Sequence, residues 1–341
     1  MAGVSEGTID RVLHNRGEVS EKTRLKVEHV LNEIEYSPNL LARSLASKKK
    51  FLFTCIIPEH KPNDYWQSVE DGFNLAARDF SQYNVQLKKY YYDQYDANSF
   101  TILSEKIIND QPDALIIAPI FKEETIKLIQ LPGFKHIPFS FIDSMLEELD
   151  FLTYYGQDSF QSGYVAARLM TQSIPQNAEV LIIRNKRKGA VSNQTFVRKK
   201  GFIQYLIDFK LSNIKLIDIE LHENDDDANY KVLQKVFQKY DNIQGAITFN
   251  SKVYRLAGYF EELHYNHIQL IGYDLLEENI GYLKKGVVSF LLAQRPEKQA
   301  YFTIRDVCMR LVMKQEVKKN NYMPVDIIIK ENIEEYRQFT E

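Results

Sequence analysis

Apolar residues recur at helical spacing through the first fifty residues of the chain. Ser5 precedes a first predicted helix, because a serine hydroxyl in this position can accept a hydrogen bond from a free backbone N–H. The apolar positions in and just before this helix are Val4, Ile9, Val12 and Leu13. A second helix is predicted to open at Ser20, and its apolar stripe comprises Val27, Val30, Leu31 and Ile34. Residues 1–50 are therefore expected to begin with a small helical unit.

From residue 51 onward, apolar strands alternate with amphipathic helices. Residues 51–57 form a continuous apolar run that Pro58 ends, as expected for a strand buried on both faces. Further strands are predicted at 85–91, 113–117, 137–142, 180–183, 214–220, 245–249, 268–272, 288–292 and 325–329. Such alternation predicts an α/β fold with parallel sheets covered by helices on both faces. Because one compact sheet would not hold so many strands, we expect two doubly wound lobes, with a boundary near 157–162.

Length and composition agree with a soluble protein of more than one domain. The chain has 341 residues, of which 44% are hydrophobic and 26% charged, which excludes a disordered tail or a collagen-like fibre. No apolar run approaches the roughly 18 residues that span a bilayer, and the N-terminus does not resemble a secretory signal. We therefore expect a cytoplasmic protein that does not contact the membrane. Cys55 and Cys308 lie in apolar surroundings and are interpreted as reduced core thiols.

The net charge of −3 is unevenly distributed. Residues 1–50, which we call the head, carry nine lysines and arginines against seven acidic residues. This segment is therefore slightly basic, and the rest of the chain is acidic. A basic head is consistent with nucleic-acid contact, although the imbalance by itself is small.

Polar and aromatic residues follow several of the predicted strands. Doubly wound sheets bind ligands beyond the carboxyl ends of their strands, and two facing sheets would form a cleft there. The candidate ligand-binding residues are Asn63, Tyr65, Trp66, Asp143, Arg198, Asn250, Asp274 and Gln294. Carboxylates, amides and a guanidinium offer directional hydrogen bonds, and aromatic rings offer flat apolar faces, so the set suits a sugar or cyclitol. The alternative is that each residue only caps a helix or closes a turn.

Two segments of the first fifty residues are distinctive, AGVSEGTIDRVLHN at 2–15 and YSPNLLARSL at 36–45. They resemble, respectively, the turn with the recognition helix and the hinge helix of the lactose-repressor family of bacterial transcription regulators. The resemblance continues through GFNLA at 72–76 and GYD at 272–274 to Gln294. It implies a helix-turn-helix head followed by a body of the periplasmic sugar-binding type, which serves as an effector sensor.

The resemblance also assigns residues to DNA. The recognition-helix positions are Ser5, Glu6, Gly7, Thr8 and Arg11, and the hinge positions are Asn39, Ala42 and Leu45. Arg11 is the candidate for a bidentate contact with guanine, and Leu45 matches the leucine that enters the minor groove. Glu6 departs from the expected pattern because its carboxylate repels phosphate.

The resemblance implies the domain boundaries. Residues 1–36 are expected to form a partial head, and 37–50 the hinge helix and linker. The N-terminal lobe comprises 51–157 and 296–323, and the C-terminal lobe comprises 158–295 and 324–341. The first helix of the helix-turn-helix is missing from this sequence, and we expect a start codon assigned too late. Without that helix the head would bind DNA poorly.

The implied function is a homodimeric regulator in which a small effector controls operator binding. Two departures in the ligand set affect the choice of effector: Ser144 stands where ribose-binding sites have arginine, which argues against ribose, and Ser251 replaces a usual aspartate. The basic segments 184–188 and 198–200 are interpreted as a solvated loop, or alternatively as the recognition element for an anionic sugar derivative.

Motifs for other chemistries do not occur in the sequence. It contains no GxGxxG after a strand, no Walker A motif, no GxSxG elbow and no histidine pair at metal spacing, so no cofactor, metal or enzymatic activity is expected. Two alternatives are a solute-binding protein without DNA-binding activity and an α/β enzyme with Asp143 or Asp274 as general base. The first would require export, and the second lacks a nucleophile or metal next to either carboxylate.

Overall fold

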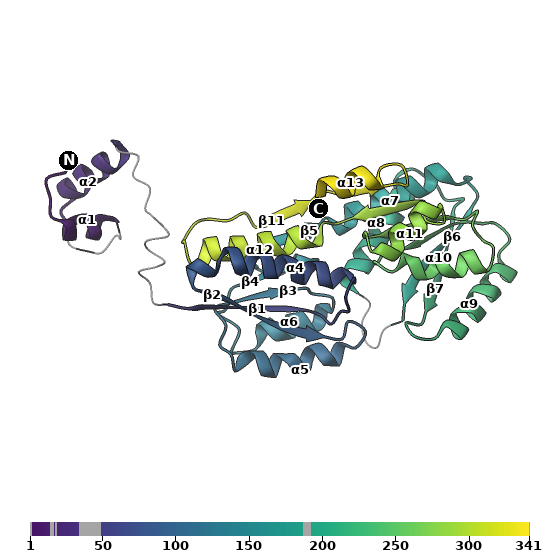
Figure 1. The fold of residues 1–341 in the computed structure, drawn as a ribbon, viewed down its shortest axis with the longest axis horizontal. Helices are drawn as coiled ribbons and strands as arrows, with labels where there is room; N and C mark the ends of the chain where they lie inside the picture. Colours follow the sequence, from purple (N-terminus) through teal and green to yellow (C-terminus); the bar gives the residue numbers. More distant parts are fainter. Residues whose placement is uncertain (1, 14–16, 18, 34–48, 187–191, 341) are drawn as a thin grey trace. The chain divides into compact units, whose positions relative to one another are not determined.

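The computed structural model describes residues 2–13, 17, 19–33, 49–186 and 192–340 (Figure 1). The chain divides into two compact units, Met1–Lys48 and Lys49–Glu341. The two units are referred to below as the head and the body.

The head contains helices α1 (Glu6–Leu13) and α2 (Glu21–Glu33). Each begins directly after the serine that the sequence indicates, which confirms both predicted starts. The backbone N–H of Thr8 donates to Ser5 Oγ at 3.3 Å, and the corresponding bond from Thr23 to Ser20 Oγ is also 3.3 Å. These bonds satisfy N–H groups that a helix leaves without partners in its first turn.

The body contains two six-stranded sheets with the same strand order (Figure 1). The first sheet has the order β11-β5-β4-β3-β1-β2, and the second has the order β12-β10-β9-β8-β6-β7. All neighbouring strands are parallel except β10 and β12, which are antiparallel. The predicted α/β fold with two doubly wound lobes is therefore confirmed.

The strands of the first sheet are β1 (Phe51–Pro58), β2 (Val85–Tyr92), β3 (Ala114–Ile117), β4 (Phe139–Asp143), β5 (Tyr154–Gln157) and β11 (Asn320–Met323). Those of the second sheet are β6 (Glu179–Asn185), β7 (Lys215–Leu221), β8 (Ile243–Thr248), β9 (Gln269–Tyr273), β10 (Phe290–Ala293) and β12 (Asp326–Ile328). β5 and β11 were not predicted. Each has only four residues and carries polar side chains, so neither gives the apolar run by which the other strands are recognised.

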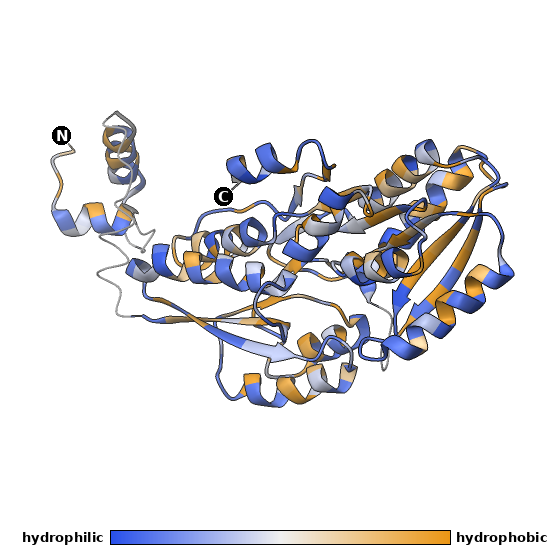
Figure 2. Cartoon of the chain, turned by 45° about the vertical axis from the view of Figure 1, so that its right-hand side comes forward, coloured by the Kyte–Doolittle hydropathy of each residue, from blue (hydrophilic) through white to orange (hydrophobic). Residues whose placement is uncertain are grey.

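Helices cover both faces of each sheet (Figure 1). The first lobe carries α4 (Tyr65–Asp79), the short 3-10 helix η1 (Ser81–Tyr83), α5 (Ala97–Ile108), α6 (Lys122–Gln130) and α12 (Pro296–Leu311). The second lobe carries α7 (Ser159–Ser173), α8 (Asn193–Asp208), α9 (Asp226–Lys239), α10 (Val253–Glu262), α11 (Glu277–Lys285) and α13 (Ile333–Thr340). Strands rich in apolar residues lie between helices that are polar on their outer sides (Figure 2). Burial of these apolar faces is the main contribution to the stability of the body.

Helices α7 and α8 approach each other closely at two glycines. A Cβ atom on Gly163 would overlap the backbone of Arg198, and one on Gly201 would overlap the backbone of Phe160. A larger residue at either position would force the helices apart. This close approach fixes the position of Arg198 on α8.

The chain crosses between the lobes three times, and one side chain connects all three crossings. The crossings run from β5 to α7, from β10 to α12 and from β11 to β12. Gln157, at the first crossing, is buried, and its Nε2 donates to the carbonyl oxygens of Ala293 at 2.7 Å and Pro324 at 3.0 Å. These two acceptors belong to the second and third crossings.

We predict that Gln157→Ala lowers the free energy of unfolding of the body by about 2 kcal/mol, because the buried carbonyl oxygen of Ala293 and the partly buried one of Pro324 lose their donor. Urea denaturation of the wild type and the variant measures this difference. Gln161→Ala is the matched control, since this exposed side chain lies four residues away on α7, and it should change stability by no more than about 0.5 kcal/mol. Equal effects of the two substitutions would contradict the role given to Gln157.

Candidate functional site

A small polar cavity lies between the two lobes of the body, at the carboxyl ends of the strands. Its volume is about 40 Å³. It is lined by Tyr65, Trp66, Gln94, Ile120, Asp143, Ser192, Gln194, Thr195, Arg198, Asn250, Ser251, Asp274 and Gln294. Residues from both lobes form its walls, so its size depends on how close the lobes are.

Arg198 is fully buried beside this cavity. Its guanidinium donates to the carbonyl oxygen of Phe249 at 2.9 Å and to Gln294 Oε1 at 2.7 Å, and its Nε has no partner within the structure described. The guanidinium carbon also lies 3.9 Å from the centre of the Tyr273 ring. A buried cation requires such compensation because its desolvation is costly.

Two buried carboxylates occupy equivalent positions in the two lobes. Asp143 ends β4 and Asp274 follows β9, and these strands are third in the orders of their sheets. Both residues have left-handed backbone angles, with φ of 67° and 69°. Asp143 Oδ1 accepts a hydrogen bond from the Tyr65 hydroxyl at 2.7 Å, and Asp274 Oδ1 accepts one from Gln294 Nε2 at 2.8 Å. Each lobe thus contributes one oriented carboxylate to the cavity.

Burial dominates the titration of both carboxylates. It raises the pKa of Asp274 to about 7, although Arg198 and the hydrogen bond from Gln294 act in the opposite direction. Burial likewise raises the pKa of Asp143, against the opposing effects of Arg198 and Tyr65. Burial and the nearby Asp143 raise the pKa of Tyr65, so its hydroxyl remains protonated and can donate.

Aromatic rings and amides complete the cavity. Tyr65 and Trp66, both buried at the start of α4, pack edge to face with ring centres 5.0 Å apart. Gln194 Nε2 donates to the carbonyl oxygen of Asp143 at 3.0 Å, although the two residues belong to different lobes. The cavity therefore offers flat apolar surface together with hydrogen-bond donors and acceptors, which is the chemistry of a site for a polar ring compound.

Further contacts across the lobes surround the cavity. The backbone N–H of Asn193 donates to the carbonyl oxygen of Ile120 at 3.1 Å, and its side chain donates to that of Met145 at 3.1 Å. On the second lobe, Lys252 pairs with Glu223 at 2.6 Å and lies 5.6 Å from the ring centre of Tyr95 on the first lobe. The lobes are closed on each other through these contacts.

The structure brings together seven of the eight residues that the sequence indicates for the ligand. Asn63 is the exception, since it is exposed in a left-handed turn (φ 69°) before α4 and does not line the cavity. Sequence reasoning missed Gln194, although it lies four residues before Arg198 and therefore on the same face of α8. It also missed Gln94, Ile120, Ser192 and Thr195, which no strand-end pattern marks.

The two serines at unusual positions both lie near the cavity. Ser251 lines it, while the hydroxyl of Ser144 is buried and has no hydrogen-bond partner in the part of the chain that the structure describes. Two residues of the basic segments, Arg184 and Lys199, have carboxylate partners. Arg184 lies 3.3 Å from Glu220, and Lys199 pairs with Asp218 at 2.5 Å; residues 187 and 188 lie outside the described residues.

In the head, Ser5 directly precedes α1, Glu6, Gly7 and Thr8 lie in its first turn, and Arg11 lies in its last turn. Ser5, Glu6, Gly7 and Arg11 are exposed, and Thr8 is half-buried with its hydroxyl 3.0 Å from that of Ser5. The hinge residues Asn39, Ala42 and Leu45 lie outside the described residues. The exposed members of this set thus lie on one short helix or directly before it.

Within the described residues, no group of three or more His, Cys, Asp or Glu side chains is arranged to hold a metal ion. None of the helices that the structure describes combines the length and apolar character needed to cross a bilayer. Cys55 and Cys308 are free and buried, and burial raises the pKa of both thiols, that of Cys308 to about 12.

Comparison with known proteins gives two family matches. Residues 54–315 match the periplasmic binding protein domain, and residues 1–39 match the bacterial regulatory proteins of the lacI family. A solved structure of a candidate LacI transcriptional regulator from Bacteroides fragilis is 37% identical, with a TM-score of 0.79, and the match covers 84% of this chain and all of that one (100%).

Two curated relatives are transcription regulators. The regulator MalR of Streptococcus pneumoniae is 24% identical over 254 residues, which are 73% of this chain and 74% of the relative. The sucrose operon repressor of Streptococcus mutans is 22% identical over 346 residues, which are 98% of this chain and 97% of the relative. The similarity therefore extends over the head and the body together.

The raised pKa of Asp274 predicts a pH dependence of stability. The folded state binds the proton of the Asp274 carboxyl group more tightly than the unfolded chain does. Asp274 therefore adds to the free energy of unfolding at low pH, and this contribution is lost as the pH rises through about 7. Relative to Asp274→Asn, the wild-type body should lose about 3 kcal/mol of unfolding free energy between pH 5 and pH 8. Denaturant titrations at both pH values measure this difference. The exposed carboxylate variant Asp150→Asn should show no such trend, and a pH-independent difference for Asp274→Asn would refute the assignment.

Proposed function

This chain belongs to the lacI family of bacterial regulatory proteins and has a periplasmic binding protein domain as its body, and we propose that a sugar-like effector bound between its lobes controls operator binding by its head. It is a transcription regulator with a ligand-binding body. The observation that carries the proposal is the polar cavity, because Arg198, Asp143 and Asp274 converge there from different parts of the chain.

The chemistry of the cavity favours a neutral polyhydroxylated ring. Carboxylate and amide oxygens accept hydrogen bonds from hydroxyl groups, Arg198 donates to ring or hydroxyl oxygens, and Trp66 offers an apolar face to C–H groups. Arg184 and Lys199, two cations of the basic segments, have carboxylate partners on β7 and do not line the cavity. This pairing favours a neutral sugar or cyclitol over an anionic sugar derivative. One relative is named as a sucrose operon repressor, which supports a sugar as the effector.

Binding requires the lobes to separate. A cavity of about 40 Å³ is far below the roughly 300 Å³ or more of typical small-molecule sites. The effector enters when the lobes part and is then enclosed when contacts such as Asn193 to Ile120 re-form. An enclosed effector adds its own contacts to those between the lobes, so its binding stabilises the closed arrangement, which is the coupling that an effector-controlled regulator needs.

The head supplies the second half of the proposal. Arg11 contacts a base edge and the exposed start of α1 enters the major groove, while Leu45 of the hinge enters the minor groove. Two copies of the chain form a homodimer in the cytoplasm and present two heads to an approximately palindromic operator.

The alternative functions lack this support. A solute-binding protein without DNA-binding activity does not explain why residues 1–39 match the lacI family. For an enzyme, Asp143 and Asp274 would need a nucleophile or metal beside them, and their hydrogen bonds go instead to Tyr65 and Gln294.

We predict that Asp143→Asn weakens effector binding about 10- to 100-fold, because it removes a charged acceptor worth about 1.5–3 kcal/mol while the Tyr65 hydroxyl still has an acceptor. Calorimetric titration with a panel of monosaccharides and cyclitols measures this change. Asn63→Gly is the matched control, since Asn63 lies outside the cavity and glycine tolerates its left-handed backbone. Loss of binding in the control as well would contradict the proposed site.

For the head, Arg11→Ala should weaken operator binding about 10- to 100-fold, because one bidentate base contact is worth about 1–3 kcal/mol. The measurement is a gel-shift titration of full-length protein against an operator selected from random DNA, with and without sugar. Lys284→Ala, which removes an exposed cation from the body, should leave operator affinity unchanged. Effector affinity should be the same in both variants, and a parallel loss of sugar binding in Arg11→Ala would count against the assignment.

A further inference from the structure

The three crossings join the lobes at one end of the two sheets. β11 and β5 lie at one edge of the first sheet, and β12 and β10 lie at the corresponding edge of the second. β2 and β7 lie at the opposite edges, and none of the three crossings starts or ends there. The cleft can therefore open at this end, which we call the mouth of the cleft and which is marked by residues 93–96 after β2 and 222–225 after β7.

Lys252 and Tyr95 meet at the mouth of the cleft. Tyr95 lies in the turn between β2 and α5, and the Lys252 Nζ lies 5.6 Å from the centre of its ring. Glu223, in the loop after β7, accepts a hydrogen bond from the Lys252 Nζ at 2.6 Å. The contact with Tyr95 joins the two lobes, whereas the contact with Glu223 stays within the second lobe.

Lys252 is held in position by the second lobe alone. Glu223 also accepts a hydrogen bond from Asn185 at 3.2 Å and lies 3.4 Å from Arg255. Only 18% of the Lys252 side chain and 20% of the Glu223 side chain are exposed, so water weakens the contacts of this cation little. Burial lowers the pKa of Lys252, but interactions with Tyr95 and Glu223 outweigh it and raise the pKa above its usual value, so the side chain remains charged.

The Tyr95–Lys252 pair lies just outside the polar cavity. Gln94 and Ser251 line the cavity, whereas the residues that follow them, Tyr95 and Lys252, are not among its lining residues. Each lobe thus places one residue against the effector and the next residue at the mouth. An enclosed effector lies behind the pair without touching it.

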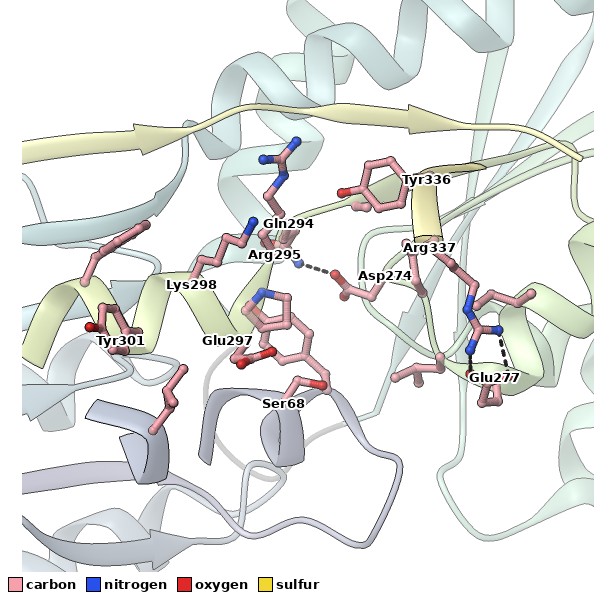
Figure 3. Close-up of a pocket in the computed structure, with 18 residues that line it drawn as sticks. Ser68, Asp274, Glu277, Gln294, Arg295, Glu297, Lys298, Tyr301, Tyr336 and Arg337 are labelled. Atoms are coloured by element: carbon pink, nitrogen blue, oxygen red, sulfur yellow. Dashed lines mark hydrogen bonds and ion pairs between the residues drawn. The ribbon is translucent and has the colours of Figure 1, made fainter. Parts of the chain in front are cut away.

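The end of the cleft near the crossings is closed by the chain itself. A larger pocket of about 460 Å³ lies there, between α4 and α12 of the first lobe and α11 and α13 of the second (Figure 3). The crossing segment 293–296 lines this pocket, and its Gln294 is bonded to Asp274 at 2.8 Å and to Gln299 at 2.8 Å. Because this segment connects the lobes covalently, it stays between the pocket and the cavity when the lobes part. The mouth is therefore the route by which an effector leaves.

We propose that Tyr95 and Lys252 form a gate that holds the lobes closed at the mouth of the cleft and sets the rate at which the effector leaves. The proposal rests on the proposed function, since it concerns the effector of the same cleft. Both are positioning residues, because they act on the effector only through closure of the lobes. Their contact must break before the lobes part, so its loss lowers the barrier to release.

The test follows the fluorescence of Trp66, which lines the cavity and is the only tryptophan in the sequence. Stopped-flow mixing of the full chain with glucose, galactose, xylose or myo-inositol gives the association rate from the slope and the release rate from the intercept. Lys252→Met should speed release at least about threefold and should not slow association, because the lost contact is one between the lobes. Lys252→Arg, which keeps the cation, should release the compound within about twofold of the wild-type rate.

A double substitution tests the contact itself. Tyr95→Leu should speed release as Lys252→Met does, and the double variant should be no faster than either single variant, because each change removes the same contact. Lys285→Met is the matched control. Lys285 pairs with Glu261 at 3.0 Å and lies 4.9 Å from the ring centre of Tyr282, an equivalent arrangement confined to the second lobe, so its loss should leave both rates unchanged. Additive effects of the two gate substitutions would overturn the gate.

A measurement without sugar separates the gate from the proposed function. Trp66 is 6% exposed in the closed lobes, so the quenching of its fluorescence by acrylamide should rise at least about twofold when the gate is removed and the lobes part more often. Thermal denaturation establishes that the variants fold. Release that is no faster in the gate variants overturns the gate and leaves the proposed function standing. If no compound binds the wild type, the sugar effector fails and quenching decides on the gate, which an unchanged quenching constant overturns.

Discussion

The buried guanidinium of Arg198 is the constraint on which the centre of the body depends. A cation without access to water must be compensated by nearby groups, and here the compensation comes from the carbonyl oxygen of Phe249, the amide of Gln294 and the ring of Tyr273. Gln294 is in turn oriented by Asp274, so the positions of several loops follow from one charge. Two glycines where α7 and α8 meet hold this charge in place.

The predictable part of this protein is the part in which local pattern and tertiary structure agree. Strands such as β1 and β6 are continuous apolar runs, and the residues that follow strand ends, Asp143 and Asp274 among them, converge because parallel strands share one edge. β5 and β11 have no such pattern, since they are stabilised by their neighbours in the sheet rather than by their own composition. Asn63 was expected in the cavity, but a left-handed turn places it on the surface.

The larger pocket could not be predicted from the sequence at all. Its walls come from α4, α11, α12 and α13, which are far apart along the chain, and no motif marks where they meet. Gln194 illustrates the opposite case, because its spacing from Arg198 on one helix face was available in the sequence. A contact can be predicted from the sequence when it depends on the spacing within one helix or strand, and it cannot when it depends on the packing of several.

The amide of Gln157 has a mechanical consequence for the body. Because its Nε2 donates to both of the other crossings, the three connecting segments are tied at one point and cannot slide past each other without breaking these hydrogen bonds. The lobes are then left with rotation about that point as their easiest relative motion. A small change in the separation of the cavity walls near this pivot becomes a larger displacement at the distant ends of each lobe, as in a lever with a short and a long arm.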